Sequence, residues 1–168
     1  EVRHSLETPI GTPRLNELAR GKSNVVIVTS DCTRPCPSYK IMPSLLDELC
    51  AAGVELECIT IVFGVGSHRK QTQDEMRALV GDRVYAAVRC MDADTEGYLV
   101  HMGDTSRGTP VDIFGVVAKA DLRICVGNIE YHYFAGYSGG YKAIMPGVST
   151  RAAIQSNHRF MTEPSACA

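Results

Sequence analysis

Long hydrophobic runs and an excess of basic residues are both missing from this sequence. Its longest apolar stretches, VVIV (25–28) and ITIVF (59–63), have the length of strands and fall far short of the roughly 20 residues that a membrane helix needs. The 17 lysines and arginines are matched by 19 aspartates and glutamates, for a formal net charge of −2. This balance argues against a nucleic-acid footprint. We therefore expect neither a membrane segment nor a nucleic-acid partner.

CxxC motifs are also missing, although the chain contains seven cysteines. An odd number without metal-ligand spacing predicts free thiols and a reducing cytoplasm rather than disulfides. Several of these cysteines fall inside apolar segments, where a thiol packs as a small hydrophobic group, so we expect most to be buried. Cys32 and Cys36 are the exceptions, because they lie in a polar loop.

Strand-like and helix-like segments alternate along the 168 residues. Apolar runs predict buried strands at 24–29, 55–63, 83–88 and 121–127, and a pairing of 97–103 with 109–114. Apolar spacing and end signals predict helices at 13–20, 40–53, 72–81, 115–120 and 149–161. Pro43 suits a first turn, and Thr72 with Glu75 suits a capping box. The alternation predicts one α/β domain of Rossmann-like, three-layer type, with a mostly parallel sheet and helices on both faces.

Three chemically rich loops each follow a predicted strand. They are SDCTRPCPS (30–38), GVGSHRKQT (64–72) and GNIEYHYFAGYSGGYK (127–142). Ligands of open α/β sheets bind at the carboxyl ends of the strands. The three loops are therefore expected to converge on one edge of the sheet.

The glycine-rich loop does not have the spacing of a phosphate-binding motif. Three residues separate Gly136 from Gly140, Tyr141 stands before Lys142, and Ala143 replaces the hydroxyl that a P-loop needs. The G-x-G-x-x-G fingerprint also fails. Its backbone N–H groups can still face an anion.

One lysine and three histidines of these segments can carry chemistry. Lys142 is either a solvated lysine at a loop end or, if buried, a nucleophilic or tethering amine. His68 and His132 lie in strand-exit loops and His158 lies on the last predicted helix. Two of the three could act as general acid and base, and one could bind a metal.

Two further charged residues follow the first predicted strand. The guanidinium of Arg34 suits a carboxylate or a phosphate, which it can bind through two hydrogen bonds. Asp31 could orient that arginine, bind a ribose hydroxyl or cap the turn.

The motifs SDCTRPCP, GSHRKQT, GNIEYHYFAGYSGGYKAIMPGVST and NHRFM, in this order, resemble the nickel-pincer nucleotide-dependent lactate racemase family. The resemblance runs from about residue 5 to the end and covers the family's N-terminal catalytic domain. It implies a second, C-terminal domain that closes over the site, supplies further substrate contacts and is missing here. The chain also begins at Glu1 without methionine and stops at EPSACA. We therefore expect residues 1–168 to be one domain of a longer protein.

The resemblance implies a nickel-pincer nucleotide as cofactor. This group is pyridinium-3,5-bisthiocarboxylic acid mononucleotide, which holds nickel through sulfur, carbon and sulfur. Lys142 matches the lysine joined covalently to one sulfur arm, and His158 matches the histidine that completes a square-planar nickel site. Proteins that make the cofactor are implied partners. Further cofactor contacts are expected at Asp31, Thr33, Gly136, Ser138, Gly139 and Gly140.

The implied reaction is racemisation or epimerisation of a 2-hydroxy acid. His68 and His132 match the two acid/base histidines, and Arg34 matches a residue that binds substrate. One histidine takes the hydroxyl proton while hydride leaves the α-carbon for the cofactor. The planar 2-keto acid then accepts hydride and proton on its other face. Lactate, malate or a sugar acid could be the substrate, and the domain alone could be inactive.

Two other functions stay open at this point. One is a zinc- or iron-dependent hydrolase that uses the same histidines with Asp31 or Asp104, although no H-E-x-x-H motif is present. The other is a non-catalytic domain that binds an anion or a nucleotide.

Overall fold

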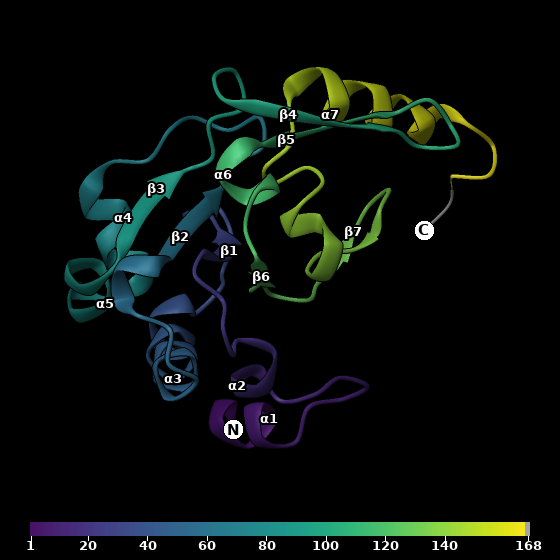
Figure 1. Ribbon diagram of the computed structural model, residues 1–168. Helices are drawn as coiled ribbons and strands as arrows, with labels where there is room; N and C mark the ends of the chain where they lie inside the picture. Colours follow the sequence, from purple (N-terminus) through teal and green to yellow (C-terminus); the bar gives the residue numbers. More distant parts are fainter. Residues whose placement is uncertain (167–168) are drawn as a thin grey trace.

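A four-stranded parallel sheet lies at the centre of the computed structural model, which describes residues 1–166 (Figure 1). Its strands are β1 (Val25–Ser30), β2 (Ile59–Gly64), β3 (Arg89–Asp92) and β6 (Leu122–Cys125). They stand in the order β3-β2-β1-β6, and all three neighbouring pairs are parallel. The order reverses at β1, since β2 lies on one side of it and β6 on the other. Such a switch point opens a crevice at the carboxyl ends of the strands.

Alternate residues of the central strands face opposite layers, because side chains of a strand alternate in direction. Val25 and Ile27 pack in one apolar cluster, and Val26 and Val28 pack in a second. Three helices pack on the first face: α3 (Ser38–Ala51), α4 (Gln73–Val80) and α5 (Asp82–Ala87). The second face carries α6 (Gly115–Ala118) and the antiparallel hairpin β4 (Leu99–Asp104)–β5 (Pro110–Phe114), and α7 (Arg151–His158) contacts β5. The predicted three-layer α/β fold is confirmed (Figure 1).

The remaining elements are short. They are the helices α1 (Val2–Glu7) and α2 (Leu15–Leu18), the 3-10 turns η1 (Leu56–Cys58), η2 (Gly140–Ala143) and η3 (Arg159–Thr162), and the strands β7 (Tyr131–His132) and β8 (Gly136–Tyr137). None of the helices within residues 1–166 has the length and apolar character needed to cross a bilayer.

Helix ends follow the predicted signals at two places and differ at one. The Thr72 side chain accepts from the Glu75 N–H and the Glu75 side chain accepts from the Thr72 N–H, so the capping box is confirmed. The last helix is capped by Thr150, one residue after the predicted start. Pro43 lies inside α3 rather than in its first turn. The helix begins earlier because Ser38 is buried and its hydroxyl is bonded to that of Thr29 at 2.8 Å.

The strand predicted at 83–88 is wrong. This segment forms helix α5, and strand β3 follows it at Arg89. Gly81, at a φ of 86°, ends α4 and directly begins α5, with Asp82 in the first turn, where a negative charge is favourable. Val84 is the only buried residue of this helix, and the partly buried Tyr85 packs beside it on the core, so the alternation that a strand would need is absent.

The apolar run 121–127 predicted a buried strand, but alternate residues of strand β6 are exposed. Arg123 and Cys125 are exposed because β6 pairs only with β1 in the described sheet. The prediction of buried thiols is also wrong for Cys50, and Cys58 and Cys90 are only partly buried. Cys36, expected in an open loop, is buried. Cys167 lies outside the described residues.

Two glycine positions let the turn after Lys142 approach the end of β2. A Cβ atom on Gly64 would lie 3.1 Å from the Cα of Gly147. The Gly66 N–H donates to the Gly147 carbonyl at 2.9 Å. A Cβ on Gly147 would overlap the carbonyl oxygen of Ala143. Backbone therefore packs on backbone here, which fixes the turn that carries Lys142 against the edge of the sheet.

We expect Gly147→Ala to lower the free energy of unfolding by on the order of 1–3 kcal/mol, because the new methyl group overlaps the carbonyl oxygen of Ala143 and forces the turn 143–147 to change shape. Urea unfolding followed by circular dichroism measures this change. Gly127→Ala is the matched control, since a Cβ there meets its nearest atom at an ordinary 3.6 Å. Equal losses for the two variants would contradict the close approach.

Candidate active site

The carboxyl ends of β1, β2 and β6 open into one cavity of about 460 Å³. Its walls come from the loops 30–38, 64–72 and 127–142, together with the turn 143–147 and helix α7. The predicted convergence of the three loops is confirmed. A cavity of this size is in the range of sites for small molecules and cofactors.

Most of the predicted site residues line this cavity. The charged and titratable ones are Asp31, Arg34, His68, His132, Lys142 and His158. The predicted loop contacts Ser138, Gly139 and Gly140 also line it. Thr33 and Gly136 do not: the exposed Thr33 is hydrogen-bonded to Asp31, and Gly136 lies in strand β8.

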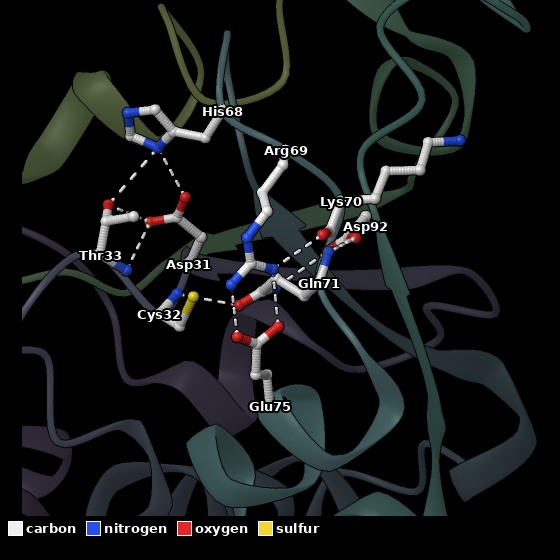
Figure 2. Close-up of polar contacts among 9 residues, drawn as sticks. All are labelled: Asp31, Cys32, Thr33, His68, Arg69, Lys70, Gln71, Glu75 and Asp92. Atoms are coloured by element: carbon white, nitrogen blue, oxygen red, sulfur yellow. Dashed lines mark hydrogen bonds and ion pairs between the residues drawn. The ribbon is translucent and has the colours of Figure 1, made fainter.

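Asp31 fixes one nitrogen of the His68 ring (Figure 2). The carboxylate oxygen Oδ2 lies 2.6 Å from Nδ1 of His68, and the second oxygen, Oδ1, accepts from the hydroxyl and the N–H of Thr33. The Asp31 side chain is 3% exposed, whereas that of His68 is 46% exposed. A carboxylate only accepts hydrogen bonds, so Nδ1 carries a hydrogen. Nε2 of the neutral ring is then a proton acceptor.

His132 has the opposite arrangement of hydrogens. It ends strand β7, and the N–H of Ala135 donates to its Nδ1 at 3.4 Å. The neutral ring therefore carries its hydrogen on Nε2. Its ring stacks on Tyr133, with centroids 4.9 Å apart, and meets the edge of Phe134 at 4.6 Å. In the neutral rings, Nε2 of His68 is thus a proton acceptor, whereas Nε2–H of His132 is a hydrogen-bond donor.

The pKa values of Lys142, His132 and His158 are all lowered, which shifts each group toward its unprotonated form. Partial burial lowers the pKa of Lys142, and the charge of Arg34 adds to the effect. The pKa of His158 is lowered by burial and then by Lys142. Burial, Lys142 and Arg34 lower the pKa of His132 in the same direction. Lys142 is thus a partly buried amine with a larger free-base fraction than a solvated lysine, as a nucleophile or a tether requires.

Sequence reasoning assigned no role to Glu130 and Phe134. Glu130 binds Arg34 through Oε1 and Nη1 at 2.9 Å, across 96 positions of the chain. Phe134 contacts His158 edge-on at 5.1 Å. Both residues lie within two positions of His132 in a strand-exit loop, which was the available signal. No local pattern, however, pairs either of them with its distant partner.

Ser138 holds the glycine-rich loop together. Its hydroxyl donates to the carbonyl of Asn128 at 2.8 Å and accepts from the N–H of Glu130 at 3.0 Å. The Ser138 N–H donates to the Glu130 carbonyl at 2.9 Å. These three bonds fix the backbone from which Glu130 reaches Arg34.

Residues 1–166 include no group of three or more His, Cys, Asp or Glu side chains placed to hold a metal ion. A catalytic zinc site of the hydrolase type uses about three protein ligands. Asp104, considered for that role, is exposed on β4 and does not line the cavity. The described residues therefore offer nothing that favours the hydrolase.

We expect Lys142→Gln to raise the pKa of both His132 and His158, because a positive charge that disfavours their protonated forms is removed. Histidine Cε1–H NMR signals followed over a pH titration measure the two midpoints. Lys119→Gln is the control, since Lys119 lies over the Tyr98 ring outside the cavity. Midpoints that stay in place in Lys142→Gln would show that the amine is not close enough to act on the rings.

Known proteins match the chain over its whole length. The family model described as "Lactate racemase N-terminal domain" matches residues 1–168. Lactate racemase of Thermoanaerobacterium thermosaccharolyticum is 38% identical over 98% of this chain and 39% of its own length. Lactate racemase of Lactiplantibacillus plantarum is 41% identical over 98% of this chain and 40% of its own. The chain thus spans about two fifths of the length of these curated relatives.

Two solved structures share the fold. The lactate racemase apoprotein of T. thermosaccharolyticum superposes with a TM-score of 0.90 at 38% identity, over 99% of this chain and 40% of that one. A protein from Thermotoga maritima superposes at 0.78 with 18% identity, over 96% of this chain and 40% of that one, a likeness of fold alone. Because the family model covers every residue and two relatives are near 40% identity, the chain belongs to the lactate racemase N-terminal domain family.

Proposed function

We propose that this chain is the N-terminal catalytic domain of a two-domain racemase or epimerase that acts on a 2-hydroxy acid such as lactate. One observation carries the proposal: two imidazoles with opposite hydrogen placement share a cavity with a partly buried lysine. The two relatives of the same family bear the name lactate racemase. Their greater length supports a second domain, which would supply the remaining walls of the site.

The residues of the cavity fit a nickel-pincer nucleotide attached to Lys142. Several wall positions are glycines, where backbone N–H groups can approach a nucleotide phosphate without an intervening side chain: Gly64, Gly66, Gly127, Gly139, Gly140 and Gly147. The lowered pKa of Lys142 suits covalent attachment. The lowered pKa of His158 suits a metal ligand, since only the neutral ring has a free nitrogen lone pair. When bound, this cofactor supplies reversible hydride acceptance from the substrate α-carbon.

The protein's own groups bind the substrate and move its protons. The Arg34 guanidinium binds the substrate carboxylate, and Glu130 holds it in orientation. Nε2 of His68 takes the hydroxyl proton of one enantiomer, and the Asp31 carboxylate stabilises the resulting imidazolium. His132, when it carries a second proton, returns the Nε2 proton to the 2-keto acid from the other side and is left neutral. The two rings exchange roles for the opposite enantiomer, which is why the site needs both.

The same proposal includes the other expected partners. Proteins that synthesise the cofactor must act before Lys142 is loaded. Free cysteines at all six described positions agree with the cytoplasm as the compartment.

We expect the full-length protein, co-expressed with cofactor-synthesis proteins, to carry a covalent nucleotide on Lys142. Intact-mass spectrometry with peptide mapping locates the adduct, and chiral analysis of a panel of 2-hydroxy acids measures racemisation. Lys142→Arg should lose both, whereas Lys119→Arg should keep both, because Lys119 lies outside the cavity. Absence of the adduct and of racemisation from the loaded wild type would falsify the proposal. A nucleotide complex that survives Lys142→Ala, without activity, would instead favour a binding domain.

His68→Gln and His132→Gln are each expected to lower kcat by roughly 10²- to 10⁴-fold, because each removes one proton-transfer group. Both variants should keep the Lys142 adduct, which separates proton transfer from cofactor loading. His101→Gln is a matched control: His101 is also bonded to an aspartate, Asp112, at 2.7 Å, but on the outer hairpin. A loss in His101→Gln equal to that in His68→Gln would contradict the assignment.

A further inference from the structure

A buried glutamine joins the loops that follow β1 and β2 to the end of β3 (Figure 2). Gln71 is 9% exposed, and three hydrogen bonds hold it. Its Oε1 accepts from the N–H of Cys32 at 2.8 Å, and its Nε2 donates to Oδ1 of Asp92 at 2.8 Å. The backbone N–H of Gln71 donates to Oδ2 of the same aspartate at 2.7 Å.

The orientation of the Gln71 amide follows from its partners. A backbone N–H can only donate, so the side-chain oxygen must face Cys32. A carboxylate can only accept, so the NH₂ group must face Asp92. Both oxygens of Asp92, the last residue of β3, are used by this one glutamine. The sheet therefore holds the glutamine through Asp92, and the glutamine holds the backbone at Cys32.

Cys32 stands between two residues that contact His68. Asp31 binds Nδ1 of His68 at 2.6 Å, and the Thr33 hydroxyl lies 3.4 Å from the same nitrogen. His68 is three positions before Gln71 in the other loop. The two loops are thus joined at two points, once through the histidine and once through the glutamine (Figure 2).

The Gln71 link matters because the contacts of the His68 ring alone do not hold the two loops at a fixed distance. Its side chain is 46% exposed, so water competes for the ring, whereas Asp31 is buried and cannot follow a displaced ring. Two further contacts on either side of Gln71 attach the same loop to α4: the bidentate Arg69–Glu75 pair and the Thr72 capping box. Gln71 bonds this anchored loop to the backbone next to Asp31, whereas His68 contacts the Asp31 and Thr33 side chains.

We infer that Gln71 is a positioning residue for proton transfer by His68. Together with Asp92 it sets the distance between the loops at which Asp31 can hold the ring in its Nδ1–H form. The inference rests on the proposed role of His68 as an acid/base group.

The test uses the full-length protein loaded with cofactor. Gln71→Leu removes both side-chain hydrogen bonds at similar volume, and kcat should fall on the order of 10- to 100-fold with KM little changed, as for other groups that orient a reacting residue. In ¹⁵N-histidine-labelled protein, the ring signals of His68 should lose the Nδ1–H signature while those of His132 stay in place. His68→Gln identifies the signals.

A double variant that exchanges the amide and the carboxylate is expected to restore the activity lost in the single variants. In Gln71→Glu/Asp92→Asn, the new carboxylate still accepts from the Cys32 N–H. The new amide donates to that carboxylate, and its oxygen accepts from the backbone N–H of position 71. All three bonds and the net charge are kept, so kcat and the His68 signature should return. Gln71→Glu alone places two carboxylates together and should lose both.

Arg69→Gln is the control within the same loop, since it breaks only the exposed pair with Glu75. The inference is overturned if Gln71→Leu keeps the wild-type His68 signature and kcat. If Gln71→Leu does not fold, the comparison of Gln71→Glu with the double variant decides, and equal signals in the two overturn the inference. Failure of the wild type to racemise would refute the proposed function, whereas the ring signals would still decide the role of Gln71.

Discussion

The position of strand β1 determines how the cavity at the carboxyl edge of the sheet is built. It is hydrogen-bonded to β2 on one side and to β6 on the other, and its apolar residues are buried in both layers. Neither ladder can shift without exposing one of these two faces, because a slip of one residue turns every side chain over. The end of β1 is therefore rigid, and the loop that begins there places Asp31 under the cavity.

Polar pairs that join different strands then hold the loops around the cavity. Asp31 with His68 links the loops after β1 and β2, and Arg34 with Glu130 links those after β1 and β6. Each pair places one buried or half-buried charge opposite its partner, as groups removed from water require. The charge of Lys142 lowers the pKa of His132 and His158. Both imidazoles are thereby shifted toward their neutral forms.

Much of the fold could be predicted because local signals agree with the tertiary structure. Strands form at the runs 24–29 and 121–127, Thr72 and Glu75 form the capping box, and 97–103 pairs with 109–114, as expected. Prediction failed at 83–88, where a short β-branched and aromatic run also fits a helix with a single buried contact at Val84. It also failed for the exposure of Cys125, since the sequence of a strand does not say whether it lies at an edge.

By itself, the sequence determined which chemical groups follow which strands. Parallel strands bring their carboxyl ends together, so His68, His132 and Lys142 could be expected at one edge from their order alone. Only the tertiary structure decided their partners. Glu130 meets Arg34 across 96 positions, and the amide of Gln71 reaches the backbone of Cys32 across 39. The hydrogen placement on each imidazole and the lowered pKa of Lys142 also depend on such contacts and on burial. These quantities follow from distance in space, which residue order does not contain.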